Sequence, residues 1–139
     1  MRVEAELVET ASAPKSFEEQ FKNPQFVEVN GAKVKIVDLV PEKPISQIPI
    51  IFAPGWSETT TTYKNSLKHI YREGYRVISF DHPRRGSTAA QMPGVPEVEA
   101  KKVQNLQAVL KHKNITQADF IGHSEGALHV AVAATEDPT

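Results

Sequence analysis

Residues 121 to 128 read "IGHSEGAL", and this stretch decides how the chain is expected to fold. It places Ser124 between Gly122 and Gly126, directly after an apolar run and directly before a helix-forming one. The flanking glycines lack side chains, so a strand and a helix can approach each other closely on either side of the serine. The stretch therefore predicts a sharp strand-to-helix turn with an exposed serine.

Upstream of this turn, strand-like and helix-like patterns alternate along the chain. Three short, mostly apolar runs predict strands: residues 48–53, 75–80 and 118–122. The first of them is of the kind buried on both faces of a sheet. Patterns with helical spacing are residues 62–74, 96–112 and 125–135. This alternation predicts an α/β domain built from βαβ units, with a mostly parallel sheet.

A β-hairpin is expected to precede the βαβ units. Residues 26–39 alternate apolar and polar side chains on both sides of Asn30-Gly31. Asn-Gly suits a two-residue turn with positive φ at both positions. Residues 1–23 are polar and show no clear period, so we expect them to form a loose arm ahead of a domain that covers residues 24–139.

Composition excludes several classes of function. A formal net charge of −1 argues against a general nucleic-acid binder or an anionic-membrane binder. The chain has no cysteine, which removes disulfides, thiolate zinc sites and cysteine nucleophiles, and no histidine pair has metal-ligand spacing. We expect no cofactor and no metal. We also expect a cytoplasmic protein without a membrane span, because neither a signal peptide nor a run of about 18 apolar residues is present.

The turn at Ser124 suits nucleophilic chemistry. A serine hydroxyl is a weak nucleophile, so it needs exposure, a base and a pocket that stabilises an anion. The glycines supply exposure, and a helix that begins directly after the serine points free N–H groups at a developing oxyanion. We therefore predict that Ser124 is a catalytic nucleophile.

Three segments together resemble the α/β-hydrolase fold family. They are "FAPGW" (52–56), "FDHPRRGST" (80–88) and "ADFIGHSEGA" (118–127), in the family's order and spacing. Two positions depart from the family pattern: Pro54 stands where histidine is common, and Arg84 replaces a glycine. The resemblance covers roughly residues 24 to 135 and implies the N-terminal portion of that fold.

The resemblance also assigns roles to residues of the turn and of the first loop. It implies that Ser124 is the nucleophile and that the backbone N–H groups of Trp56 and Glu125 form the oxyanion hole. Gly122 and Gly126 correspond to the glycines of the family's nucleophile elbow. Serine rather than aspartate at this position argues against dehalogenase or epoxide-hydrolase chemistry.

The acid and the histidine of the family's triad are not found after the serine. The acids that follow Ser124 are Glu125, Glu136 and Asp137, and the one histidine is His129. Asp137 is expected roughly 18 Å away along the helix, and His129 is tied to the face of that helix. The sequence thus predicts the N-terminal half of a longer hydrolase, ending before its acid and histidine.

Two other histidines are weak candidates for the base. His123 adjoins the serine, but a tight turn directs neighbouring side chains apart, and His82 is better explained as a loop residue. If further strands are missing, residues 118–122 form an exposed edge with Phe120 and Ile121 accessible, which favours self-association.

The function predicted from sequence is hydrolysis of esters or related acyl substrates by a serine nucleophile. The expected partner is a small acyl molecule, with no nucleic acid. Two alternatives stay open: a non-catalytic fragment or interaction module, and a half-enzyme that another chain completes with the acid and the histidine.

Overall fold

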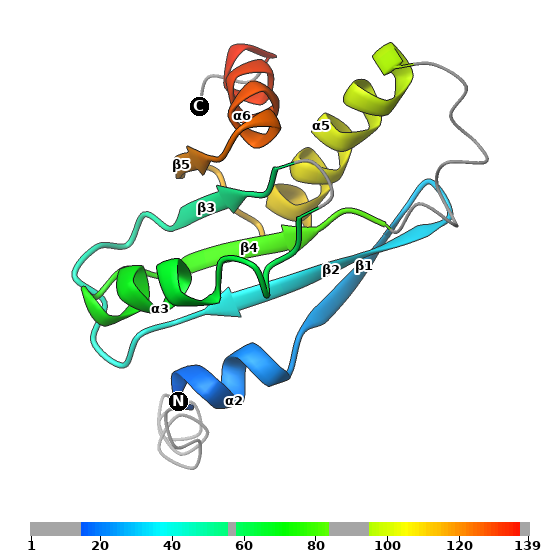
Figure 1. The fold of residues 1–139 in the computed structure, drawn as a ribbon. Coiled ribbons are helices and arrows are strands. Elements are labelled where there is room, and N and C mark those ends of the chain that lie inside the picture. Colours follow the sequence, from blue (N-terminus) through cyan, green and yellow to red (C-terminus); the bar gives the residue numbers. More distant parts are fainter. Residues whose placement is uncertain (1–14, 56–57, 84–94, 137–139) are drawn as a thin grey trace, which may run out of the picture.

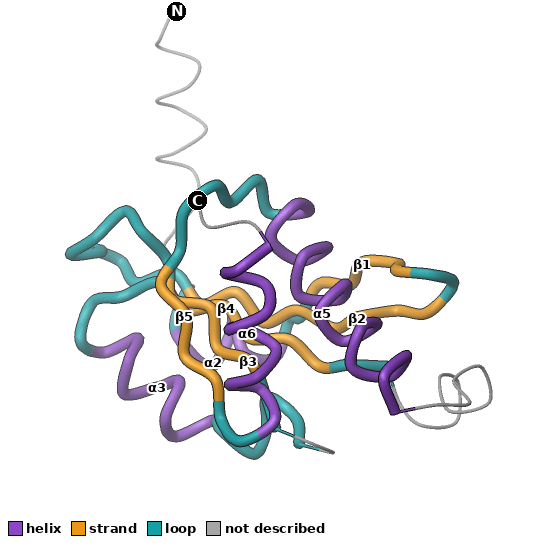
Figure 2. Tube along the Cα trace, turned by 90° about the horizontal axis from the view of Figure 1, so that it is seen from above, coloured by secondary structure: helices purple, strands orange, loops and turns teal. Residues whose placement is uncertain are grey.

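The computed structural model describes residues 15–55, 58–83 and 95–136, which form a sheet with helices on both faces (Figures 1 and 2). The strands are β1 (Gln25–Val29), β2 (Ala32–Leu39), β3 (Ile50–Ala53), β4 (Val77–Asp81) and β5 (Asp119–Gly122). The helices are α2 (Phe17–Lys22), α3 (Lys64–Arg72), α5 (Val95–His112) and α6 (Glu125–Glu136). The α/β class predicted from sequence is confirmed.

The sheet has the order β1-β2-β4-β3-β5 and is mixed rather than mostly parallel. β3 pairs in parallel with β4 and β5, whereas β1–β2 and β2–β4 pair antiparallel. The prediction of a mostly parallel sheet was therefore wrong, because antiparallel pairs are as numerous as parallel pairs in the described sheet. Local alternation identifies β2 as a strand, but it carries no sign of which distant strand lies along its second edge, where Leu39 faces Val77.

The predicted hairpin is confirmed. Val29 of β1 faces Ala32 of β2 across a two-residue turn. Asn30 has a φ of 53° and Gly31 a φ of 82°, so both turn residues adopt the left-handed region that Asn-Gly tolerates. The hairpin positions β2, whose other edge joins the rest of the sheet.

Two apolar clusters hold the layers together, one on each face of the sheet. Between the sheet and α5 with α6 lie Val34, Ile36, Ile51, Ala53, Ile78, Phe80, Val103, Leu106, Val109 and Ala133. Between the sheet and α2 with α3 lie Phe17, Val37, Leu39, Phe52, Tyr63, Leu67 and Val77. Successive residues of β2 contribute to opposite clusters, as the period of two in a strand requires.

Part of the expected N-terminal arm is a helix. Ser16 and the Glu19 side chain form a capping box at the start of α2. Phe17 is buried, and its ring centroid lies 5.4 Å from that of Tyr71 on α3. This helix was not predicted from the sequence, because its six residues are too few to show a helical period and contain one apolar pair, Phe17 and Phe21. Residues 1–14 of the arm lie outside the described residues.

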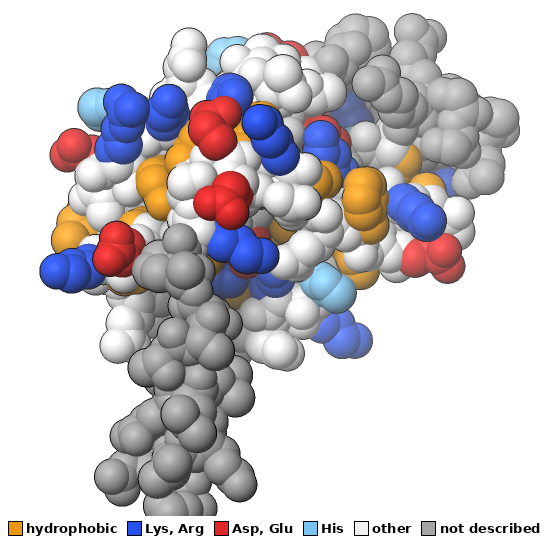
Figure 3. Space-filling model, turned by 90° about the horizontal axis from the view of Figure 1, so that it is seen from below, with side chains coloured by type: hydrophobic (Ala, Val, Ile, Leu, Met, Phe, Trp, Pro, Cys, Tyr) orange, Lys and Arg blue, Asp and Glu red, His pale blue; other side chains and the backbone are white. Residues whose placement is uncertain are grey.

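Charged side chains of both signs lie among one another on the face that Figure 3 shows. One ion pair on the exposed surface joins α3 to α2, with Lys64 Nζ 2.9 Å from Glu18 Oε1. Exposed pairs of this kind contribute little stability. No helix of the described ranges is long and apolar enough to cross a membrane.

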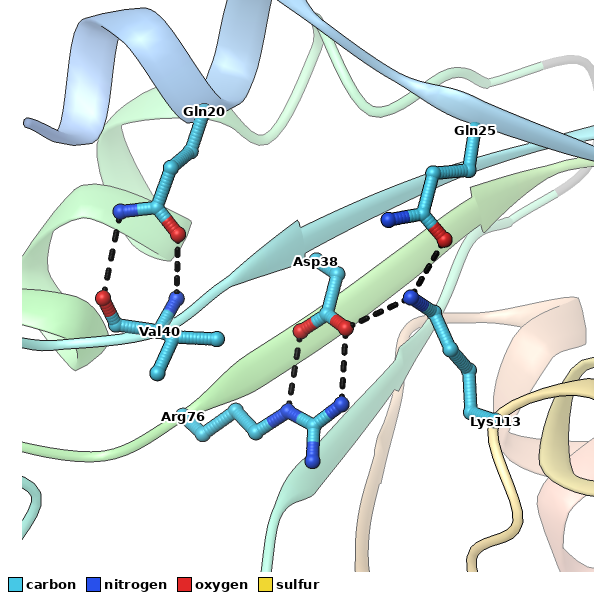
Figure 4. A network of polar contacts seen from close by, with 6 residues as sticks. All are labelled: Gln20, Gln25, Asp38, Val40, Arg76 and Lys113. Carbon is cyan, nitrogen blue, oxygen red and sulfur yellow. Dashed lines mark hydrogen bonds and ion pairs between the residues drawn. The ribbon is translucent and has the colours of Figure 1, made fainter. Parts of the chain in front are cut away.

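A partly buried ionic network lies at the amino end of β4 (Figure 4). Asp38 Oδ1 accepts from Arg76 Nε at 2.9 Å and Oδ2 accepts from Arg76 Nη2 at 2.7 Å, while Lys113 Nζ lies 2.9 Å from the same Oδ2. Lys113 also donates to Gln25 of β1, so the network ties β1, β2 and β4 to the end of α5. In a separate contact nearby, the Gln20 side chain forms hydrogen bonds with both backbone groups of Val40.

The charges around Asp38 control its protonation. Burial by itself would raise the pKa of this carboxyl, but the hydrogen bonds and charges of Arg76 and Lys113 outweigh burial and hold the pKa below its ordinary value. The carboxylate therefore stays ionised, and the two cations remain compensated.

We expect Asp38→Asn to lower the free energy of unfolding by about 2 kcal/mol at pH 7, because it leaves two largely buried cations without their anion. The contribution of Asp38 is present above its unfolded pKa of about 3.9 and is lost as the pH falls through the lower folded value. Urea unfolding at pH 7 and at pH 2.5 should therefore show a gap between wild type and variant that narrows in acid. The exposed Asp119→Asn is the matched control, and an equal loss in both variants would contradict the prediction.

Candidate active site

Ser124 stands at the apex of the turn between β5 and α6. β5 ends at Gly122 and α6 begins at Glu125, so two residues make the connection. Ser124 is exposed and has a φ of 56°, a left-handed conformation that is uncommon for a residue with a side chain. The turn is held by the Gly126 N–H, which donates to the His123 carbonyl oxygen over 2.9 Å.

The glycines beside Ser124 are required for space rather than for backbone conformation. A Cβ atom on Gly122 would lie 2.5 Å from the Gly126 carbonyl oxygen and 2.6 Å from the Ala127 backbone nitrogen. A Cβ on Gly126 would lie 2.4 Å from the Ala53 carbonyl oxygen at the end of β3. These neighbours are backbone atoms that cannot rotate away. The first turn of α6 therefore rests directly on the ends of β5 and β3.

The side chain of Glu125 contacts Lys102 and His129, and neither contact is predicted from the sequence. Lys102 Nζ of α5 lies 2.6 Å from Glu125 Oε1, and 14% and 18% of the two side chains are exposed. His129 Nε2, one helical turn further along α6, lies 3.4 Å from the same oxygen. The first turn of α6 is thus fixed to α5 by an ion pair directly after the serine.

A polar cluster joins the loop after β3 to the residue before Ser124. The Tyr63 hydroxyl accepts from the Gly55 N–H at 3.0 Å and donates to the Glu58 carboxylate. His123 Nδ1 lies 2.9 Å from the Tyr63 hydroxyl and 3.1 Å from Glu58 Oε1. We call Glu58, Tyr63 and His123 the tyrosine cluster. It holds the loop after β3 against the turn that carries the serine.

The contacts within the tyrosine cluster shift the pKa values of Tyr63 and Glu58. Burial and the neighbouring carboxylate raise the pKa of Tyr63 to about 12. The hydrogen bonds from Tyr63 and His123 hold the pKa of Glu58 below its ordinary value. Near neutral pH the phenol therefore keeps its proton and the carboxylate keeps its charge, so the carboxylate favours the His123 tautomer with a proton on Nδ1.

The loop ends after β3 and β4 are also joined. The Thr60 N–H donates to Asp81 Oδ1 at 2.7 Å, and Lys35 Nζ lies 4.0 Å from Asp81 Oδ2. The carboxyl ends of β3, β4 and β5 thus meet at one edge, where open α/β sheets place their ligands.

His82 is a poor candidate for a base. Its Nδ1 lies 3.0 Å from the Asn105 side-chain amide, and its ring packs edge-on against that of His129, with 5.8 Å between centroids. Burial, with the charges of Lys102 and His129, lowers the pKa of His82 to about 3. An imidazole with this pKa is neutral near pH 7 and is a weak acceptor for a further proton.

Among the described residues, Glu58 contacts His123 and Glu125 contacts His129, and the sequence predicts neither contact. No local pattern reveals the first contact, because its members are 65 residues apart. His129 is 1% exposed, so it cannot reach a substrate at the surface.

Several residues named from sequence lie outside the described residues. They include Trp56, the second expected oxyanion donor, and three positions of the loop after β4: Arg84, Gly86 and Thr88. Among the residues that the structure does describe, no group of three or more His, Asp or Glu side chains is placed to hold a metal ion.

Comparison with known proteins identifies the fold. No protein-family model matches the chain. A non-heme haloperoxidase from Rhodococcus erythropolis is 30% identical over 83 residues, which are 60% of this chain and 30% of that protein. A putative epoxide hydrolase from Klebsiella pneumoniae subsp. pneumoniae superposes with a TM-score of 0.68 at 22% identity, over 88% of this chain and 40% of that one. The thioesterase domain from the curacin biosynthetic pathway gives 0.66 at 17% identity, over 84% and 42%.

These neighbours are α/β-hydrolase fold enzymes, and the chain has a part of that fold. It spans 30% of the length of the haloperoxidase and 40% of the epoxide hydrolase. The resemblance inferred from the three sequence motifs is confirmed at the level of the fold.

Gly126→Ala should test the close approach of α6 to β3. The added methyl group would meet the Ala53 and Pro54 carbonyl oxygens, so we expect a loss of about 1–3 kcal/mol in the free energy of unfolding. Chemical denaturation measures it. The control is Ala127→Ser on the exposed side of the same turn, which should change stability by less than about 0.5 kcal/mol. A Gly126→Ala chain as stable as wild type would mean that the helix does not rest on β3.

Proposed function

We propose that the chain carries the nucleophile of a serine hydrolase that acts on esters or related acyl substrates in the cytoplasm. The observation that carries the proposal is the exposed Ser124 with a φ of 56° on a turn whose two glycines touch backbone. Strain of this kind is retained where the surrounding structure enforces it, and it concentrates at functional sites. In this chain the strained residue is Ser124, and its hydroxyl lies at the edge of the sheet where β3, β4 and β5 end.

In the proposed reaction the Ser124 hydroxyl oxygen attacks a substrate carbonyl carbon while a base takes the hydroxyl proton. The backbone N–H groups of Glu125 and Trp56 stabilise the resulting oxyanion, and the start of α6 favours negative charge at this point. The leaving group departs with the proton, and water then cleaves the acyl-enzyme by the same route. The acid and the histidine that activate the serine come from outside this sequence.

The choice of a serine favours acyl substrates over epoxides. A carboxylate that opens an epoxide forms an ester, which water can cleave at the ester carbonyl. A serine that opened an epoxide would form an ether, which has no carbonyl for water to attack. The epoxide hydrolase among the solved structures shares the fold with this chain. For the chemistry, Ser124 favours acyl substrates, which the name of the thioesterase domain also describes.

The proposal predicts that a fluorophosphonate labels the purified chain at Ser124. The reaction mirrors attack on a carbonyl, because the serine oxygen displaces fluoride from phosphorus. Since the activating residues are proposed to lie outside the chain, we expect labelling to be slow and to accelerate between pH 7 and pH 9. Intact mass and peptide mapping measure it.

Three variants sharpen this experiment. Ser124→Ala should abolish labelling, and Ser66→Ala, on the exposed side of α3, should leave it unchanged. His123→Gln should also retain labelling if the base is external. Two outcomes would contradict the proposal. One is a folded wild-type chain that stays unlabelled at pH 9, and the other is labelling that persists in Ser124→Ala.

We also propose that the chain self-associates through β5. This strand is the last in the described sheet, Ile121 on it is 39% exposed and Phe120 is half-buried. An accessible apolar edge offers unpaired backbone groups to another copy. Light scattering should show a mass that rises with concentration and a weaker rise in Ile121→Lys. Val40→Lys, away from β5, is the control, and a wild type that stays monomeric at all concentrations would exclude the association.

A further inference from the structure

We propose that Lys102 is a positioning residue for Ser124: its ammonium group offsets the Glu125 carboxylate, which would otherwise oppose an anion formed at the serine. The proposal rests on the proposed function, because it concerns the oxyanion of that reaction. It assigns a role to a residue of α5, an element that supplies none of the predicted catalytic groups.

The ion pair is close and mostly withdrawn from water. Lys102 Nζ donates to Glu125 Oε1 at 2.6 Å, and less than a fifth of either side chain is exposed. Charges interact more strongly in such surroundings than at an open surface, where solvent screens them. Loss of one partner would leave the other without this counter-charge in a mostly buried position.

The position of the carboxylate makes its charge relevant to Ser124. Glu125 is the next residue, with its Cα about 3.8 Å from that of the serine. It lies in the first turn of α6, whose N–H groups favour negative charge. A carboxylate in this turn that lacked the Lys102 charge would weaken that preference for any second anion beside it. Lys102 removes most of the opposing field while leaving the N–H groups in place.

The groups around the pair also bear on this field. His129 Nε2 lies 3.4 Å from the same carboxylate oxygen. His82 packs on His129 and stays neutral in the physiological range, because burial lowers its pKa to about 3. On the other side of the serine, the Glu58 carboxylate contacts His123. The variants below substitute ionisable side chains of this group at Lys102 and Glu125 alone and leave His82, His129 and Glu58 in place.

A single thiol can report this field without any need for catalysis. The chain has no cysteine, so Ser124→Cys introduces a unique probe at the position of the nucleophile. The thiolate is the reactive form, and its share depends on nearby charge. The rate of alkylation by neutral iodoacetamide as a function of pH therefore gives the pKa of the thiol.

In the Ser124→Cys background, Lys102→Met should raise the thiol pKa and slow alkylation at pH 7.5 by roughly fivefold to tenfold. Glu125→Gln should shift the pKa in the opposite direction and accelerate alkylation. The double variant should return close to the parent, and Lys102→Arg should resemble the parent. Lys111→Met, on the exposed end of α5, is the control for loss of a distant cation.

Shifts of opposite sign separate this role from a purely structural one, because unfolding would move every variant toward the ordinary thiol value of about 8.5. An unchanged rate in Lys102→Met, or shifts of the same sign in both single variants, would overturn the proposal. Fluorophosphonate labelling of Ser124 without the opposite thiol shifts would refute the role of Lys102 alone. Opposite shifts in a chain that fluorophosphonate never labels would refute the hydrolase and leave the charge pairing standing.

Discussion

The contact of α6 with the ends of β3 and β5 is the constraint on which the site depends. Gly122 and Gly126 let backbone touch backbone, and a single methyl group at either position would separate the elements. The left-handed φ of Ser124 follows, since the chain must reverse into the helix within two residues. The tyrosine cluster and the Lys102–Glu125 pair then fix the two sides of this turn, and neither could form if the helix stood further out.

Polar interactions in this fold are divided between the two ends of the sheet. The Asp38 network lies at the amino end of β4, where it ties strands to α5 and exposes little of its carboxylate. The tyrosine cluster, the Thr60–Asp81 hydrogen bond and the Lys102–Glu125 pair lie where β3, β4 and β5 end. Stability and chemistry can thus be altered by different substitutions, because the two sets share no residue.

Sequence patterns predicted the two sharp turns, which are encoded locally, although they missed the short helix α2. Asn30-Gly31 specified the hairpin turn, and the glycines around Ser124 specified the strand-to-helix turn, because each depends on a few neighbouring residues. The antiparallel pairing of β2 with β4 joins segments about forty residues apart, and alternation in either strand does not name its partner. The same applies to Glu58 with His123 and to Lys102 with Glu125. Their contacts exist because the fold brings distant loops and helices together.

The place of β5 in the sheet also determines how steadily the serine is held. β4 is paired along both edges, whereas β5 is paired within the described sheet with β3 alone. Strands with fewer neighbours open locally at lower free energy, and their amide hydrogens exchange sooner with solvent. Ser124 therefore follows one of the two edge strands of the described sheet, which open more readily than the central strands. Anything that pairs with the outer edge of β5 in the described sheet also lengthens the time for which the turn keeps the left-handed conformation of Ser124.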